Sequence, residues 1–320
     1  TTIICLIVIA LHVITLIIQG ISPSFHLPYL GKGIVGDGYR MLTDLALTVL
    51  LAVTLFAIYR RVVLRPERYK VPERYGKDKT FRDAVISLAL LAGLAVLDIT
   101  FIASGWRVDA YAGADTHFLI PLTGTWITAS VLGLFSPGTN QALHVISFML
   151  LIVLIFGFIC YFPFGRFFHL VTGPPNVFFK KLKKGSVKPV KWGIDDDKLD
   201  ELESFGVKKF EDFTWKHMLD FYACTDCGRC SDNCPATTVG RSLSPRFISI
   251  KGRDYAFSHY PLKGPFIQNE PLIGDVYSED EIWSCTTCGA CEEECPVTIE
   301  YIDKIVDLRR GMVDEGNVPQ

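Results

Sequence analysis

The sequence predicts an all-α protein in two parts, a transmembrane helix bundle followed by a smaller helical domain that carries a repeated cysteine motif. Two observations lead to this fold class. Up to about Val171 the chain is dominated by long apolar runs, whereas the remainder is charged and holds eight of the ten cysteines. Over all 320 residues the hydrophobic content is 49% and the mean hydropathy is positive, which fits neither an ordinary soluble enzyme nor a pure channel.

Four apolar runs approach the roughly 20 residues that cross a bilayer, namely 1–20, 42–64, 83–105 and 141–163. Arg and Lys orient these runs, because positive residues gather on the cytoplasmic side of membrane proteins. The connection 60–82 and the stretch after the last run are rich in both, which predicts a cytoplasmic position. The loops 21–41 and 106–140 carry few of them and are expected outside. The apolar stretch 117–135 would break this alternation if it crossed, so we expect it at the outer face or half inserted.

Residues 173–213 have the composition of a connector between domains. They mix Pro, Gly, a Lys cluster and an acidic patch, as surface-running chain does. The lysines either anchor the cytoplasmic side of the bundle or form a docking surface for an acidic partner. The predicted domains are therefore a membrane domain at 1–172, this connector, and a cysteine-rich domain of short helices at 214–320. The chain starts inside an apolar run without Met and stops in linker-like sequence, so we expect further sequence at both ends.

Two stretches near the C-terminus follow the same pattern, C-x2-C-x2-C-x3-C-P. In two-cluster ferredoxins the three closely spaced cysteines ligate one iron-sulfur cluster, and the fourth, followed by Pro, ligates the other. The pattern therefore predicts a ferredoxin-like domain with two [4Fe-4S] clusters in crossed ligation. The predicted ligands are Cys224, Cys227, Cys230 and Cys295 for cluster 1, and Cys285, Cys288, Cys291 and Cys234 for cluster 2.

Zinc and disulfides are the alternatives for these cysteines. Zinc favours two separated C-x2-C pairs over a run of four cysteines with a trailing Pro, and disulfides are disfavoured on a cytoplasmic face. Gly228 and Gly289 follow the second cysteine of each motif and are expected to let the backbone approach the sulfides. Cys5 and Cys160 lie in apolar runs, where a free cysteine is usually a packing residue.

Two clusters in series can carry electrons. In a membrane-bound protein we expect this electron path to end at a further redox cofactor in the membrane. Histidines inside spans are candidates, because ionisable side chains in a bilayer are costly. At ~1.5 Å per residue, His12 lies about 12 Å and His144 about 6 Å from the outer ends of their spans, so the two could hold a haem b. His169, just past the last span, would serve a second haem, with a partner ligand from upstream of Thr1. A hydrogen bond to a neighbouring carbonyl is the alternative role for each histidine.

Two carboxylates also lie inside predicted spans. Asp98, in the third span, could relay protons to or from a quinone near the haem. Its alternative role is an ion pair or a helix–helix hydrogen bond within the bundle. Asp44, in the second span, lies nearer to the outer edge and is the weaker candidate.

The run HVISFMLLIVLIFGFICYFPFGRFFHLVTGPPNVFF, residues 144–179, resembles the last membrane helix of the nitrate reductase gamma-subunit group of haem b proteins. In that group a Pro-Phe-x-Arg-x-x-His ending supplies a haem ligand, which implies His169 here. This chain has Leu151 where the group usually has its other haem histidine, so the resemblance leaves one or two haems open. The cysteine repeat with its long insert resembles the iron-sulfur subunit of heterodisulfide reductases, but the CCG region of that family is absent from these residues.

The fusion of both parts resembles membrane-bound iron-sulfur oxidoreductases that pass electrons from electron-transfer flavoprotein to menaquinone. This resemblance implies a multi-pass protein of the cytoplasmic membrane, with lipid, quinone and a cytoplasmic redox subunit as partners. The alternative is a quinol-oxidising subunit that delivers electrons to a heterodisulfide-reducing or sulfur-reducing partner. A membrane-tethered redox sensor is a further alternative, although a sensor needs only one cluster. The basic residues sit beside membrane segments, so no nucleic acid is expected as a partner.

Overall fold

The computed structural model describes residues 2–22, 33–67, 79–114, 116–183, 205–260 and 272–318. Within these ranges the regular structure is helical, apart from a single β-bridge between Ile273 and Tyr277, so the predicted all-α fold class is confirmed there. The described residues form two compact units. Among the described residues, the bundle unit contains those up to Gly165 except Glu67. The cysteine unit contains Glu67 and the residues from Arg166 onwards.

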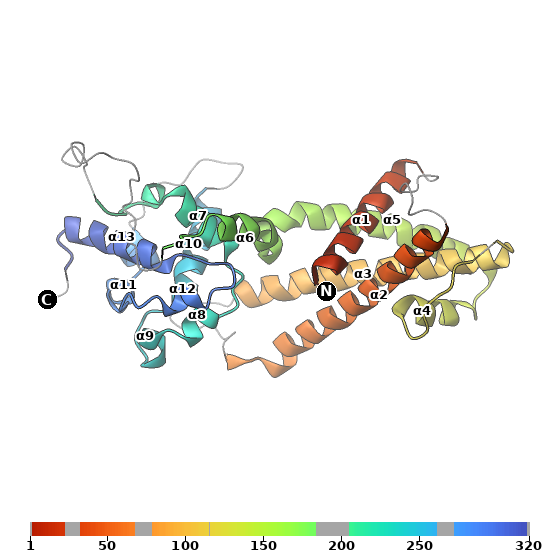
Figure 1. Ribbon diagram of the computed structural model, residues 1–320, viewed down its shortest axis with the longest axis horizontal. Coiled ribbons are helices and arrows are strands. Elements are labelled where there is room, and N and C mark those ends of the chain that lie inside the picture. Colours follow the sequence, from red (N-terminus) through yellow and green to blue (C-terminus); the bar gives the residue numbers. More distant parts are fainter. Residues whose placement is uncertain are drawn as a thin grey trace. The chain divides into compact units, whose positions relative to one another are not determined.

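The bundle unit is organised around its longest helix, α3 (Lys79–Tyr111). Helix α3 packs against α5, α2 and α4, whereas α1 packs mainly against α2 (Figure 1). Short π-helical and 3₁₀ turns, Arg60–Leu64 and Phe162–Phe164, extend α2 and α5. The remaining helices are α1 (Thr2–Ile21), α2 (Gly33–Tyr59), α4 (Gly124–Leu132) and α5 (Pro137–Tyr161).

Three helices of the bundle unit are long and apolar enough to cross a membrane: Gly33–Leu64, Phe81–Tyr111 and Pro137–Phe164. They coincide with three of the four predicted spans. The first apolar run is helical as α1, but its described side chains form only a shorter apolar helix, Val8–Ile21, so a fourth span stays a prediction. Within the stretch 117–135 only α4 is helical, and its nine residues cover ~14 Å, too short to cross a bilayer.

The bundle unit is apolar outside and partly polar inside. Large apolar side chains on α5 such as Val153 and Phe156 are 69% and 52% exposed, whereas Asp98, Ser104 and Asn140 are buried. Ser104 and several threonines donate their hydroxyl protons to backbone carbonyls four residues earlier on the same helix. An apolar surface of this kind is unstable in water and stable in lipid, which indicates a membrane protein.

The cysteine unit is a cluster of short helices around an aromatic and aliphatic core (Figure 1). The core includes Phe210, Phe221, Ile282 and Leu308, each 3% exposed or less. Two longer helices, α10 and α13, frame the cysteine motifs. The helices are α6 (His169–Phe178), α7 (Trp215–Ala223), α8 (Arg229–Asp232), α9 (Pro235–Thr238), α10 (Pro245–His259), α11 (Glu279–Trp283), α12 (Ala290–Glu293) and α13 (Tyr301–Asp314).

The boundary between the units differs from the predicted domain boundary at residue 172. Helix α6 runs through that boundary and packs on α7 in the cysteine unit. Part of the predicted connector also belongs to this unit, since Val207 is fully buried and its N–H donates to the carbonyl of Asp307 at 2.9 Å. Residues 184–204 of the predicted connector lie outside the described residues. Composition suggested a linker in the described part as well, because polar side chains such as Asn176 are typical of surface chain, whereas Asn176 is fully buried.

Candidate functional site

The two cysteine motifs adopt the same backbone conformation. The residue directly before the second cysteine is left-handed in both motifs, with φ of 55° at Asp226 and 54° at Thr287. The glycine after the second cysteine is also left-handed, with φ of 83° at Gly228 and 79° at Gly289, and each glycine begins a one-turn helix. Glycine adopts this conformation without steric cost. The spacing and the glycine therefore turn the three cysteines of each motif toward a common centre.

The first cavity is lined by Cys224, Cys227 and Cys230 from one motif and by Cys295 from the other. It encloses about 270 Å³ outside the protein atoms. Its wall also contains the ion pair between Arg246 and Asp226, both of which are buried. The structure therefore brings together the four residues that the sequence predicted for cluster 1.

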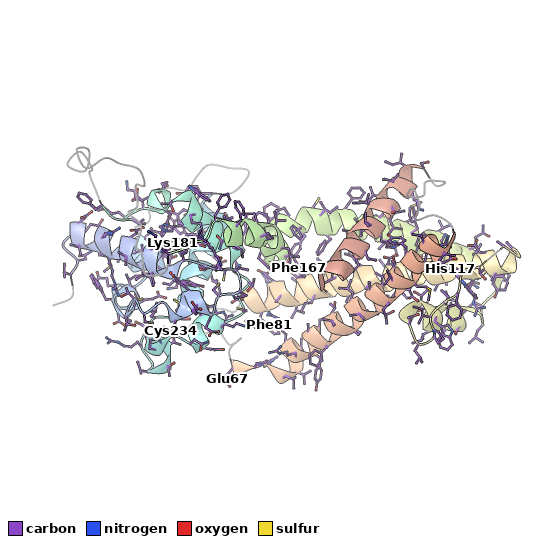
Figure 2. The ribbon with its side chains drawn as sticks, in the orientation of Figure 1. Glu67, Phe81, His117, Phe167, Lys181 and Cys234 are labelled. Carbon is purple, nitrogen blue, oxygen red and sulfur yellow. The ribbon has the colours of Figure 1, made fainter. Side chains whose placement is uncertain are left out.

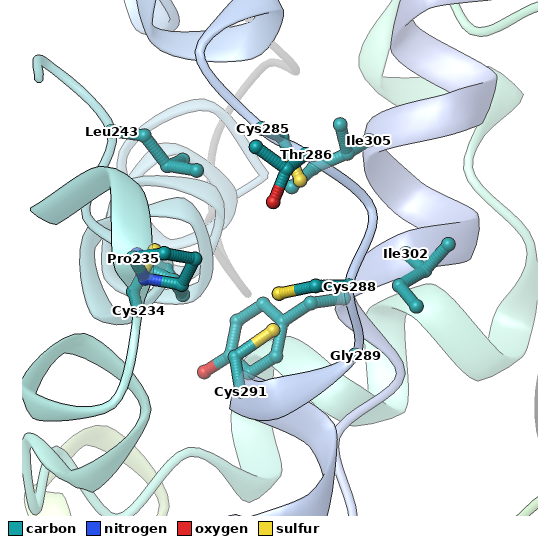
Figure 3. A pocket seen from close by; sticks show the side chains of 12 residues that line it. Cys234, Pro235, Leu243, Cys285, Thr286, Cys288, Gly289, Cys291, Ile302 and Ile305 are labelled. Carbon is teal, nitrogen blue, oxygen red and sulfur yellow. The ribbon is translucent and has the colours of Figure 1, made fainter.

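The second cavity shows the reciprocal arrangement. Cys285, Cys288 and Cys291 line it together with Cys234, which approaches from the opposite side (Figure 3). This cavity encloses about 340 Å³. Cys288 is exposed and Cys285 half-buried. These four residues are the set that the sequence predicted for cluster 2.

The geometry suits iron-sulfur clusters better than single metal ions. In the part of the chain that the structure describes, no three His, Cys, Asp or Glu side chains converge as ligands of one ion would. Four cysteines instead line each cavity, which is the number of ligands that a [4Fe-4S] cluster takes. Burial raises the pKa of Cys224 to about 12 and that of Cys230 to about 11, so the thiolate form there needs a nearby positive charge. Iron supplies that charge when a cluster binds.

Hydrogen bonds to the sulfurs complete both sites. The backbone N–H of Thr287 donates to Cys285 Sγ at 3.3 Å, and that of Ile299 donates to Cys295 Sγ at 3.4 Å. The hydroxyl of Tyr301 donates to Cys230 Sγ at 3.5 Å. Sequence reasoning missed Tyr301, because an aromatic residue six positions after the last cysteine is no motif. The available signal was the helical spacing of the apolar residues Ile299, Ile302 and Ile305 around it.

A buried charge network lies between α6, α7 and α13. Asp220, fully buried, accepts hydrogen bonds from Lys216 at 2.7 Å, Lys304 at 2.6 Å and Asn176 at 2.9 Å. Burial alone would raise the pKa of Asp220, but the two lysines outweigh it and lower the pKa. Asn176 also donates to the carbonyl of Val297, two residues after Cys295. The network therefore fastens α6 to the loop that carries a cysteine of the first cavity.

In the bundle unit, His12 and Asp98 form a pair, with 3.0 Å between Nε2 and Oδ1. The structure thus joins a predicted haem ligand to the predicted proton relay. His144 instead packs on α3, where Nδ1 lies 3.1 Å from the carbonyl of Phe101 and the ring stacks on the Phe101 ring. Gly105 gives the imidazole room, since a Cβ there would lie 2.8 Å from His144 Cε1.

His169 is the first residue of α6 and is therefore part of the cysteine unit, not of the bundle unit that holds His12 and His144. The Pro-Phe-x-Arg-x-x-His ending consists of two 3₁₀ turns followed by α6. Its last residue begins a helix that is anchored on the cysteine side by Asn176.

A further cavity lies in the bundle unit between α1, α2, α3 and the segment 117–119. It encloses about 540 Å³ and is lined by polar and apolar residues, among them His12, Tyr39, Arg40, Asp44 and His117 (Figure 2 labels His117). Asp44 is 5% exposed; its Oδ2 accepts a hydrogen bond from Thr123 at 2.6 Å. Its Oδ1 is buried and has no hydrogen-bond partner among the residues described. The sequence indicated His12 and Asp44 as separate candidates, and the structure places both in the wall of this cavity.

Comparison with known proteins adds the chemistry. A family model described as a 4Fe-4S dicluster domain matches residues 223–299. "Probable iron-sulfur-binding oxidoreductase FadF" of Bacillus subtilis is 29% identical over 94% of this chain and 44% of its own length. "EtfAB:quinone oxidoreductase" of Syntrophomonas wolfei is 31% identical over 78% of this chain and 38% of its own. "Probable membrane-anchored ferredoxin" of Chromohalobacter salexigens is 40% identical over 38% of this chain and 21% of its own.

Iron-sulfur subunits of heterodisulfide reductases match as well, and no solved structure matches. The chain spans less than half the length of the three relatives described above. The matched residues 223–299 contain all eight cysteines of the two cavities. The chain is thus a relative of iron-sulfur oxidoreductases and carries a 4Fe-4S dicluster domain.

Proposed function

We propose that this chain is the membrane-bound electron-transfer part of an iron-sulfur oxidoreductase that carries electrons between a cytoplasmic redox partner and menaquinone. The observation that carries the proposal is the crossed arrangement of the cysteines, three from one motif and one from the other around each cavity. The dicluster match supports it, as do the three helices long enough to cross a membrane. In this proposal α1 is a fourth span, and the basic residues of 60–82 keep the cysteine unit cytoplasmic.

Electron-transfer flavoprotein is the proposed donor and quinone the proposed acceptor. The relative from Syntrophomonas wolfei carries EtfAB and quinone in its name, and three helices long enough to cross a membrane support a hydrophobic acceptor. The reverse direction is the second candidate: quinol oxidation that feeds a heterodisulfide-reducing or sulfur-reducing partner. The matches to heterodisulfide reductase subunits favour this second candidate.

The eight cysteines are the proposed ligands of two [4Fe-4S] clusters, in the pairing given above. When bound, such a cluster stores and releases single electrons. The chain itself supplies thiolates in fixed positions, backbone N–H donors at Thr287 and Ile299, and a buried aromatic wall. Donors aimed at the sulfurs stabilise the extra negative charge of the reduced state.

Haem b is a second proposed cofactor, for which His144 is the best-oriented ligand in the bundle unit. A ligating histidine commonly donates its other ring N–H to a carbonyl or carboxylate, and His144 Nδ1 lies 3.1 Å from the carbonyl of Phe101, which leaves Nε2 for iron. His12 is instead assigned to proton transfer, because it pairs with Asp98 and lines the bundle cavity. His169 remains the proposed ligand on the cytoplasmic side.

The bundle cavity is the proposed quinone site. Its wall combines apolar side chains with a few polar groups, as the walls of small-molecule sites commonly do. Reduction of a quinone to a quinol adds two electrons and two protons. His12 lines the cavity, and its Nε2 pairs with Asp98. Protonated His12, stabilised by the Asp98 carboxylate, can donate one proton to a quinone oxygen in the cavity. Solvent then reprotonates His12, which delivers the second proton in the same way. Asp98 therefore acts through His12.

The test uses the purified membrane complex in lipid nanodiscs, with iron and haem content measured first. Reduced electron-transfer flavoprotein is added, cluster reduction is followed by electron paramagnetic resonance, and a menaquinone analogue is then mixed in. We expect rapid reduction of the clusters by the flavoprotein and reoxidation by the quinone. Reduction by quinol together with no response to flavoprotein would establish the second candidate instead.

The Asp98→Asn variant tests the cavity within the same assay. Loss of the proton relay is expected to slow quinone-driven reoxidation by about 100-fold or more, while reduction by the flavoprotein stays unchanged. Asp83→Asn is the matched control, since Asp83 lies on the same helix α3 and its backbone carbonyl, not its side chain, accepts a hydrogen bond from Tyr161. Equal quinone rates in the two variants would exclude the cavity as the quinone site.

A further inference from the structure

Tyr301 stands between the two cysteine cavities. Among the residues that the structure describes, it lines both the cavity of Cys224, Cys227, Cys230 and Cys295 and the cavity of Cys234, Cys285, Cys288 and Cys291. It is 1% exposed and is the first residue of α13. A side chain in this position affects whatever occupies either cavity.

The contacts of Tyr301 are not symmetric between the cavities. Its hydroxyl donates to Cys230 Sγ at 3.5 Å, a ligand position of the first cavity. In the described structure no hydrogen bond joins it to Cys234, Cys285 or Cys291 of the second cavity. The same residue therefore donates a hydrogen bond to a cysteine of one site and to none of the other.

The surroundings hold the tyrosine in this orientation. Two residues earlier, the N–H of Ile299 donates to Cys295 Sγ at 3.4 Å, which fixes the entry to α13. Lys304 Nζ lies 5.5 Å from the Tyr301 ring centroid, and Lys304 is fully buried and held by Asp220 at 2.6 Å. A cation over the face of the ring attracts it, which helps to fix the ring in place.

We propose that Tyr301 sets a difference in reduction potential between the two cysteine sites, raising the potential of a cluster held by Cys230 relative to one held by Cys285, Cys288 and Cys291. A donor to a ligand sulfur stabilises the reduced state, and hydrogen bonding and burial are general determinants of cluster potentials. Tyr301 is thus a positioning residue that acts through Cys230. The inference rests on the proposed function, because it requires both clusters to be present.

The test is a redox titration of the full-length Tyr301→Phe variant, followed by electron paramagnetic resonance, with iron and sulfide content as a first check. Phe keeps the ring and removes only the hydroxyl. We expect the potential of the first cluster to fall and that of the second to stay constant. Tyr277→Phe is the matched control: Tyr277 is also fully buried in the cysteine unit, its hydroxyl donates to the carbonyl of Ile248 at 2.8 Å, and it lines neither cavity.

An unchanged first potential, or equal shifts of both, would overturn the inference. A second measurement needs no variant: wild-type protein grown with ring-deuterated tyrosine is examined by pulsed resonance, and deuterium coupling to both cluster signals is expected. Coupling to neither would place Tyr301 elsewhere and overturn the inference as well. Wild-type protein that binds fewer than two clusters would contradict the proposed function itself, and the iron and sulfide assay separates this outcome from the others.

Discussion

The two cysteine motifs are nearly identical in backbone and differ in environment. Asp226 and Thr287 share a φ near 55°, and Gly228 and Gly289 share a φ near 80°. Yet Cys224, Cys230 and Cys234 are buried, whereas Cys288 is exposed and Cys285 and Cys295 are half-buried. Spacing and glycine therefore decide the local backbone geometry of each motif. The surrounding helices decide how far each site is exposed to water and which charges lie near it.

The charges around the two cavities differ in the same way. The first cavity contains the buried pair of Arg246 and Asp226, and the loop of its Cys295 is tied to the Asp220 network. Near the second cavity, Arg309 donates to the carbonyls of Ile282 and Cys285. One site is thus fixed by charges inside the core and the other by an arginine that binds the loop backbone.

The largest expected effect tests the crossed pairing. Cys234→Ser should remove the same resonance signal as Cys291→Ser, although Cys234 belongs to the other motif, because both line the second cavity. Each variant should lose about half of the iron. Iron analysis and electron paramagnetic resonance measure both, and Cys160→Ser, an exposed cysteine of α5, is the control. A Cys234→Ser spectrum that resembles that of Cys224→Ser would mean that each motif binds its own cluster.

The next effect compares two buried carboxylates, Asp220 in the network that holds the Cys295 loop and Glu281 beside the second motif. Asp220→Asn leaves Lys216 and Lys304 without their shared carboxylate, at a cost of about 3–5 kcal/mol. Glu281→Gln beside the second motif should cost less, because its partner Lys251 is 24% exposed and water can solvate the ammonium group. Apparent Tm by circular dichroism checks the order. Equal losses would show that the core charges do not distinguish the two sides.

The third effect is a pH dependence of stability. Burial raises the pKa of Asp307 to about 7 in the folded protein, against an ordinary value of 3.8. The folded state therefore binds a proton that the unfolded state has lost, so stability falls as pH rises from about 4 to about 7, by on the order of a few kcal/mol. Below the ordinary value both states are protonated, and above the folded value both are ionised, so the slope ends there.

Asp307→Asn should flatten this slope, because Asn has no proton to lose. Apparent Tm measured across the pH range gives the slope for both proteins. Asp220 provides the contrast within the same unit: its lowered pKa means that its contribution is lost only in acid, as pH falls below the ordinary range of an aspartate. An Asp307→Asn protein with the wild-type slope would assign the pH dependence to another group.

The smallest effect tests the shared backbone. Gly228→Ala and Gly289→Ala each place a Cβ on a left-handed residue, which costs about 1–2 kcal/mol. The costs should be similar, since both glycines have nearly the same φ. A Cβ at Gly289 would meet only Ile302 Cδ1, at an ordinary 3.6 Å. Apparent Tm of the two variants measures the difference. A much larger loss at one glycine would show that its surroundings, not its backbone, decide the cost.

Much of the fold could be read from the chain. Three apolar runs are long helices, and the all-α class holds for the described residues. The connector was harder to predict, because the polar residues that look like linker, such as Asn176, are buried partners in the core. The His12–Asp98 pair was also beyond sequence, since 86 positions separate the two residues and helix packing alone brings them together.

By itself the sequence predicted eight cysteines as cluster ligands and their crossed pairing, because thiolate spacing, glycine and a trailing proline are local properties. It also determined which segments prefer lipid, because hydropathy adds up along a run. The tertiary structure alone decided that Tyr301 lies between both cavities, that Asp220 is shared by two lysines, and that α6 belongs with the cysteine unit. These are contacts between residues distant in the chain, and their energies depend on burial, which no local pattern encodes.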